Sequence, residues 1–115
     1  MSLEFKTEIR HGVSVISCPK RLDIQNSDRL RELLARTVEK QIYQITMDLS
    51  QTAYIDSSGL GAIVSIIATV RANQGDIRLA AAAGNITNLL EITQLNKLLK
   101  CYKTVEEGVK SFSST

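Results

Sequence analysis

Residues 52–61 hold two serines, a carboxylate and two glycines at the start of an expected helix, and no other stretch combines these groups. Ser57 or Ser58 would act as the helix N-cap, where a side-chain oxygen accepts a hydrogen bond from a free backbone amide. The remaining free amides and the helix dipole favour an anion, so a phosphate would be accommodated there. Gly59 and Gly61 each cost about 1 kcal/mol relative to alanine in a helix, which indicates that another protein's backbone approaches this turn.

The alternative for two serines before a helix is a simple cap, which is common in α/β proteins and involves no chemistry. A serine nucleophile needs a base, and the only histidine, His11, precedes Gly12 in an expected hairpin turn. The sequence has no GxSxG, GxGxxG or GxxxxGK[ST] pattern, so it favours neither a hydrolase nor a common nucleotide site. We therefore predict no catalytic residue and no cofactor.

A metal site would need acidic or thiol side chains that gather in the fold. Asp23, Asp48 and Asp56 could meet near one end of a sheet, but aspartates at strand ends are more often turn and cap residues. Cys18 and Cys101 lack CxxC or Cys/His spacing, which favours two buried thiols within strands over a disulfide or metal pair. No metal is predicted.

The composition is that of an ordinary globular domain, with 43% apolar and 23% charged residues. A chain of 115 residues predicts one domain over residues 1–115. The net charge of +2, with scattered basic residues, does not require nucleic acid or an anionic membrane as partner. The sequence has no apolar run near the ~20 residues of a membrane span and no signal-peptide pattern at its start, so we expect a cytoplasmic protein.

Hydrophobic periodicity predicts strands that alternate with helices after an opening hairpin. The expected strands cover residues 3–10, 13–18, 42–49, 77–82 and 98–102. The first expected helix runs from Asn26 or Ser27 to residue 40, and the second from 58 to 74, with Gly75 as a left-handed C-cap. A short third helix is expected to begin at Asn85 or Thr87. A fourth follows a capping box at Thr104. This order predicts an α/β fold with a mixed, mostly parallel sheet, an N-terminal hairpin at its edge and about four helices. In such sheets function gathers beyond the carboxyl ends of parallel strands, where Asp56 is expected.

The sequence resembles the bacterial anti-sigma-factor antagonists, small proteins of the STAS-domain family, over nearly its whole length. The most specific parts are MDLS at residues 47–50 and YIDSSGLG at residues 54–61, which are similar to the family's strand and phosphorylation loop. Weaker support comes from Leu22-Asp23 and from residues 85–92 with Leu95. The basic pair Lys20-Arg21 departs from the glycine and acidic residue that the family often has before Leu-Asp.

The resemblance implies a phosphorylation-controlled partner switch. In that family the serine after the loop aspartate accepts the phosphate, which falls on Ser57 here. The unphosphorylated antagonist binds an anti-sigma factor, usually also a serine kinase of the histidine-kinase-like ATPase type, and so frees a sigma factor. The kinase ends the complex by phosphorylation, and a PP2C-type phosphatase restores it. The expected partner-binding residues are Asp23, Asp56, Ser58, Gly59, Leu60, Gly61 and Ala62.

Two alternatives remain open at this point. The chain would instead be a STAS scaffold or accessory subunit of a signalling or lipid-transport assembly, without phosphorylation, although the intact motif at residues 56–59 argues against this. A small serine hydrolase would depend on His11 as its base.

Two further expectations concern the residues around the motif. Four residues are expected to lie off the core stripe of their helix and to form a partner face, with packing on a neighbouring helix as the alternative: Gly59, Ala62, Ile66 and Thr69. Asp56 is expected to serve recognition rather than folding, with a turn-forming aspartate as the alternative.

Overall fold

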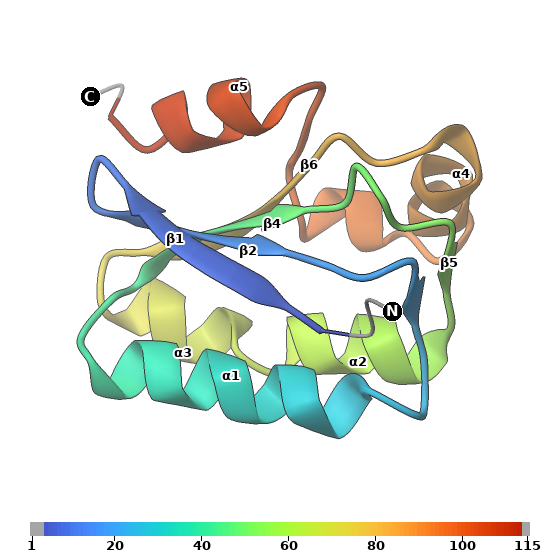
Figure 1. Cartoon of the computed structure of the whole chain (residues 1–115). Coiled ribbons are helices and arrows are strands. Elements are labelled where there is room, and N and C mark those ends of the chain that lie inside the picture. The colour runs from blue at the N-terminus through green and yellow to red at the C-terminus, as the bar shows by residue number, and fades with distance from the viewer. Residues whose placement is uncertain (1–3, 114–115) are drawn as a thin grey trace.

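A computed structural model describes residues 4–113 of the chain and has a mixed five-stranded sheet at its centre (Figure 1). The first two strands form an antiparallel hairpin, and every later neighbour is parallel. In spatial order the strands are β1 (Lys6–Arg10), β2 (Val13–Ser17), β4 (Gln44–Asp48), β6 (Asp76–Ala80) and β7 (Cys101–Tyr102). The predicted fold class, with its hairpin edge, is therefore confirmed.

Helices cover both faces of this sheet (Figure 1). One face carries α1 (Ser27–Glu39), α2 (Ser57–Val64) and α3 (Ile67–Ala72). The other face carries α5 (Val105–Lys110). Helix α4 (Gly84–Ile92), followed by the short 3-10 helix η1 (Leu95–Lys97), lies at the end of the sheet near β5. No helix within residues 4–113 is long and apolar enough to cross a membrane.

The main core lies between the sheet and α1 to α3. Ile16, Ile45, Met47, Ile77 and Leu79 of the three central strands are fully buried in it. A smaller cluster of Val13, Val15 and Val109 fills the face under α5. Strand β4 is buried on both faces, as its continuous apolar and β-branched sequence predicts.

A second, two-stranded parallel sheet lies beside the main one and was not predicted. It pairs β3 (Arg21–Leu22) with β5 (Tyr54–Ile55). Each strand has two residues, too few for a two-residue alternation to appear in the sequence. This small sheet brings the segment before α1 against the segment before α2.

The predicted single helix over residues 58–74 is wrong, because it is divided into α2 and α3 at Ser65-Ile66. The Ser65 hydroxyl donates to the Ala62 carbonyl oxygen at 2.6 Å, and Ile66 precedes the restart of the helix without a side-chain cap. Residues 63–67 contain four β-branched residues around this serine, which have low helix propensity. The helix therefore breaks where its local sequence supports it least.

Other local expectations need correction. Gln74, with φ 61°, takes the left-handed conformation predicted for Gly75. Gly75 is required for another reason, since a Cβ there would lie 1.9 Å from the Tyr43 carbonyl oxygen. Helix α4 begins after Ala83 without a side-chain cap, whereas Asn85 Nδ2 donates to the Ala53 carbonyl oxygen at 2.9 Å. The capping prediction for Thr104 is confirmed, because its hydroxyl accepts from the Glu107 amide at 3.0 Å.

The two thiols differ, although both were expected to be buried. Cys18 is buried next to the carboxyl end of β2, and its amide donates to the Asp48 carbonyl oxygen. Burial, with a smaller contribution from the Asp48 charge, raises the pKa of the Cys18 thiol. Cys101 is exposed on the edge strand β7, so the expectation of burial is wrong for it.

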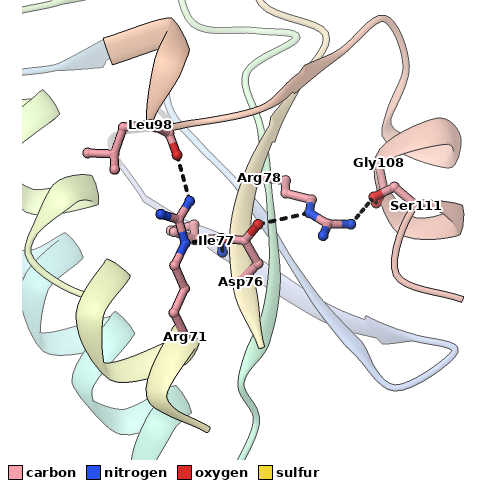
Figure 2. A network of polar contacts seen from close by, with 7 residues as sticks. All are labelled: Arg71, Asp76, Ile77, Arg78, Leu98, Gly108 and Ser111. Carbon is pink, nitrogen blue, oxygen red and sulfur yellow. Dashed lines mark hydrogen bonds and ion pairs between the residues drawn. The ribbon is translucent and has the colours of Figure 1, made fainter. Parts of the chain in front are cut away.

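At the amino end of β6, one carboxylate joins elements on both faces of the sheet (Figure 2). Asp76 Oδ1 accepts from Arg71 Nε of α3 at 3.0 Å, and Asp76 Oδ2 accepts from Arg78 Nε at 3.1 Å. Arg71 also donates to the Leu98 carbonyl oxygen at 2.6 Å, and Arg78 donates to the Ser111 hydroxyl at 2.7 Å. We call Arg71, Asp76 and Arg78 the basal clamp. It ties α3, β6 and the end of α5 together.

Candidate functional site

The candidate site is built around Asp56, which is the N-cap of α2. Its Oδ1 accepts from the Ser58 amide at 2.8 Å and from the Gly59 amide at 3.0 Å. The expectation that Ser57 or Ser58 caps this helix is therefore wrong. Asp56 has the extended backbone and the acceptor side chain that an N-cap requires. The carboxylate thus has a folding role, and its role in recognition stays a prediction.

Ser57 is the first residue of α2 and is exposed. Its hydroxyl has no hydrogen-bond partner among residues 4–113, whereas the Ser57 peptide is held in place by the cap on one side and β5 on the other. Ser58 is half-buried, and its amide is engaged by Asp56. Of the two serines, Ser57 is the more accessible to a modifying enzyme.

The β3–β5 pair fixes the position of this turn relative to α1. Leu22 pairs with Ile55, and the Asp56 amide donates to the Leu22 carbonyl oxygen at 3.1 Å. Because the strands are parallel, Asp23 and Asp56 follow the pair at the same end. Both aspartates were predicted to bind a partner, and the fold brings them to one edge.

The turn after Asp23 is held by its own hydrogen bonds. Asp23 Oδ1 accepts from the Gln25 amide at 3.0 Å, and Asp23 Oδ2 accepts from Arg21 Nε at 3.2 Å. Asn26 Oδ1 accepts from the Asp23 amide at 3.0 Å, and Asn26 Nδ2 donates to the Arg21 carbonyl oxygen at 2.7 Å. Asn26 therefore stabilises this turn and does not cap α1 with its side chain.

The two glycines of the motif have different surroundings. A Cβ on Gly59 would lie 2.5 Å from the Leu22 carbonyl oxygen, so the close backbone approach at this position comes from β3 of the same chain. A Cβ on Gly61 would meet only the Arg31 guanidinium, at 3.3 Å, which can move. The expectation that another protein's backbone requires both glycines is wrong for Gly59, and for Gly61 it stays a prediction.

The expected exposed face of α2 is not present as predicted. Ala62 is 0% exposed and belongs to the main core, and Gly59 is buried as well. Both residues are therefore packed inside the domain, and the backbone of β3 and the Ile55 side chain of β5 are the close neighbours of Gly59. Ile66, at the break between the helices, is half-buried against the same core. Thr69 is exposed, but it lies beyond the break, in α3.

Three surface residues at this edge were not assigned to the site from the sequence. Ile24 is 71% exposed in the turn after Asp23, and Tyr54 of β5 is 42% exposed. The Arg21 guanidinium lies over the Tyr54 ring, 4.4 Å from its centroid. Only Ile24 has a signal in the sequence, as a large apolar residue between the polar residues Asp23 and Gln25. We call Arg21, Ile24 and Tyr54 the rim.

The histidine that a serine hydrolase would need lies on other elements than the candidate site. His11 lies at the hairpin turn between β1 and β2, with φ 52°, and the candidate serines are at the start of α2. Within residues 4–113, no three histidine, cysteine, aspartate or glutamate side chains gather as a metal site would require. The site therefore consists of an exposed hydroxyl on a rigid cap, two carboxylates and a partly apolar rim.

This fold and this capped loop define the class of the protein. The sequence model of the STAS domain matches residues 4–108, and the chain belongs to the STAS-domain family. The match includes all of the strands and most of α5, so the family assignment rests on nearly the whole chain.

Several named proteins are similar to this chain over nearly their whole length. The anti-sigma-B factor antagonist of Listeria monocytogenes is 28% identical, over 92% of this chain and 91% of its own length. A solved structure from Thermotoga maritima, provisionally described as an anti-sigma factor antagonist, has a TM-score of 0.88 at 25% identity, over 96% of this chain and 95% of that one. The Bacillus protein SpoIIAA in its phosphorylated form has a TM-score of 0.73 at 18% identity, over 94% and 98% of the chains, and shares the fold.

Proposed function

We propose that the protein is an anti-sigma factor antagonist that is switched by phosphorylation of Ser57. In its unphosphorylated form it binds an anti-sigma factor that is also a serine kinase of the histidine-kinase-like ATPase type, and a sigma factor is released. The kinase then modifies Ser57 and ends the complex. A PP2C-type phosphatase removes the phosphate. We expect this cycle in the cytoplasm.

The observation that carries the proposal is the exposed Ser57 hydroxyl at the start of a helix whose cap is made by the preceding residue. A kinase can reach this oxygen without disturbing the fold, because the Asp56 cap uses the Ser58 and Gly59 amides. The names of the relatives support an anti-sigma factor as the partner. SpoIIAA, which shares the fold, is described in phosphorylated and unphosphorylated forms.

Phosphate would act on the interface and leave the domain folded. It adds about −1.5 to −2 charges at pH 7 beside Asp56 and Asp23. Inside the domain the helix dipole offsets part of this repulsion. In a desolvated interface the same charge costs far more when it meets like charge, and each ~1.4 kcal/mol lowers affinity tenfold. The loss of partner affinity therefore exceeds the loss of stability.

The test uses the full chain with purified anti-sigma factor kinases from the same organism. Incubation with ATP, followed by mass spectrometry of the intact protein, should add one phosphate to the wild type and none to Ser57→Ala. Ser57→Ala should bind the kinase and resist release by ATP. Ser57→Asp should fold but bind at least tenfold more weakly.

Ser58→Ala is the matched control and should still accept phosphate at Ser57. If phosphate is lost from Ser58→Ala but kept by Ser57→Ala, the assignment of the serine is wrong. If neither serine accepts phosphate although the kinase binds the chain, a STAS scaffold without phosphorylation replaces the proposed switch.

A further inference from the structure

The outer edge of β1 is the longest strand edge that the main sheet leaves unpaired. β1 pairs with β2 on one side, and among the described residues no strand pairs with its other side. All five β1 residues are exposed, whereas the opposite edge strand, β7, has only two residues. Free amides and carbonyls along such an edge form a template for another strand.

Charges of alternating sign lie along one face of this strand. Glu4, Lys6, Glu8 and Arg10 are spaced by two residues, so their side chains share a face in extended chain. In order along the chain their signs are negative, positive, negative and positive. Glu8 and Arg10 already form an ion pair within the chain.

The other face of the strand is apolar or neutral. Phe5, Thr7 and Ile9 lie on it, and Phe5 packs partly against the main core. Ile9 is 57% exposed, although the strand that it pairs with, β2, is almost entirely buried. An apolar residue of a second strand would cover it.

We propose that β1 pairs antiparallel with β1 of a second copy of this chain, about a two-fold axis at Thr7. Glu4 then lies opposite Arg10 of the second copy, and Lys6 lies opposite Glu8. Phe5 lies opposite Ile9, and Thr7 lies opposite itself. Each contact except Thr7–Thr7, which lies on the axis, occurs twice by symmetry, so the strand is self-complementary, as a two-fold interface requires.

The alternating charges select this register over its neighbours. With the axis at Glu8, the pair Glu8–Glu8 and the pair Lys6–Arg10 bring like charges together. With the axis at Lys6, the pair Lys6–Lys6 and the pair Glu4–Glu8 do the same. Like charges directly opposite each other destabilise a strand pair. Axes at Phe5 or Ile9 would also avoid like charges, but each pairs only two of the four charged residues, whereas the axis at Thr7 pairs all four with opposite charges.

A contact through one short strand is small, so the dimer is weak and depends on concentration. Sedimentation velocity of the full chain, from about 10 µM to about 1 mM, should move from monomer towards dimer. Lys6→Glu alone puts a second carboxylate opposite Glu8 and should abolish the shift. Glu8→Lys alone puts a second ammonium group opposite Lys6 and should abolish it as well.

The charge pattern also predicts rescue. An equimolar mixture of the Lys6→Glu chain and the Glu8→Lys chain places opposite charges at every pair, so it should form a dimer that neither variant forms alone. The double variant carrying both substitutions should dimerise like the wild type. Lys97→Glu, on η1, makes the same charge change away from the edge and should have no effect. A chain that stays monomeric over the whole range, or a dimer that none of the β1 substitutions changes, would overturn the proposal.

Discussion

Asp56 and Asp76 lie at opposite ends of the sheet, and the carboxylate of each accepts hydrogen bonds from several donors. The donors differ, and so does the role of the negative charge. Asp76 is bound by two guanidinium groups, from Arg71 and Arg78, and its side chain is only 12% exposed. Asp56 accepts from two backbone amides and makes no ion pair among the described residues. At Asp76 the charge holds the fold together, whereas at Asp56 the fold requires only an acceptor oxygen.

This difference separates stability from recognition. A carboxylate that is neutralised by two arginines inside the molecule has little charge left for a partner. At Asp56 the cap itself does not depend on the charge, since an asparagine would cap nearly as well. Under the proposed switch, the charge at Asp56 would then be available to a partner or a modifying enzyme.

The largest effect should come from removing the charge at Asp76. Asp76→Asn leaves Arg71 and Arg78 without their carboxylate, and breaking such a part-buried pair should cost about 2–3 kcal/mol of unfolding free energy. The matched variant Asp56→Asn should cost less than about 0.5 kcal/mol, because the amide oxygen still accepts. Urea denaturation of both variants measures the difference. Equal losses would remove the distinction between the two aspartates.

The next effect concerns the two glycines of the motif. Gly59→Ala forces a methyl group against the Leu22 carbonyl oxygen and should destabilise the fold by about 1–3 kcal/mol. Gly61→Ala meets only the mobile end of Arg31 and should stabilise by up to about 1 kcal/mol through helix propensity. If Gly61 is a partner contact, the second variant should gain stability and lose affinity for the anti-sigma factor. Urea midpoints and a binding titration separate these effects, and a stabilised Gly61→Ala chain with unchanged affinity would remove Gly61 from the interface.

A smaller effect should separate the two roles of Asp56. Asp56→Ala removes the cap and should cost about 1 kcal/mol, whereas Asp56→Asn keeps it. We expect both variants to change the rate of phosphorylation or dephosphorylation of Ser57, since both lack the charge. The rates are followed by intact-protein mass spectrometry at matched folded fractions. Wild-type rates in Asp56→Asn would leave the residue with its capping role alone.

The smallest effect appears only at alkaline pH and comes from the buried thiol of Cys18. Burial raises the pKa of Cys18 in the folded chain above its ordinary value of 9.0. Below about pH 9 the thiol keeps its proton in the folded and in the unfolded chain, so the free energy of unfolding is unaffected. Above about pH 9 only the unfolded chain loses the proton, and the free energy of unfolding falls by about 1 kcal/mol up to pH 10. Cys18→Ala should flatten this alkaline slope, whereas Cys101→Ala, at the exposed thiol, should change it less. Urea midpoints at about pH 8, 9 and 10 provide the measurement, because these pH values span the ordinary thiol pKa.

Much of the fold was predictable because its signals are long and periodic. Strand β4 and helix α1 each carry an uninterrupted pattern, and their tertiary environment agrees with it. The small β3–β5 sheet was not predictable, since two residues carry no pattern and the pairing joins segments 33 residues apart, as in Leu22 with Ile55. The break at Ser65 was also missed, because apolar spacing continues through it.

Within the candidate site, residue types were easier to predict than their roles. The motif pointed to Ser57, which the structure shows to be exposed and whose phosphorylation stays a prediction, and it marked Asp56 without showing that this carboxylate is the cap. Ala62 was misplaced because helical spacing alone does not show which sides of a helix other elements cover, and in the fold this residue is fully buried. Gly59 was assigned to a partner backbone, and the backbone that approaches it is β3, which the sequence did not predict.

The β3–β5 ladder also has a kinetic consequence. It joins the starts of α1 and α2 through Leu22 and Asp56, so the surface around Ser57 exists before any partner arrives. Binding to a preformed surface needs no ordering step, and association can then approach the rates of rigid proteins. Under the proposed switch, the time the system takes to change state would be set by kinase and phosphatase turnover and by dissociation of the complex.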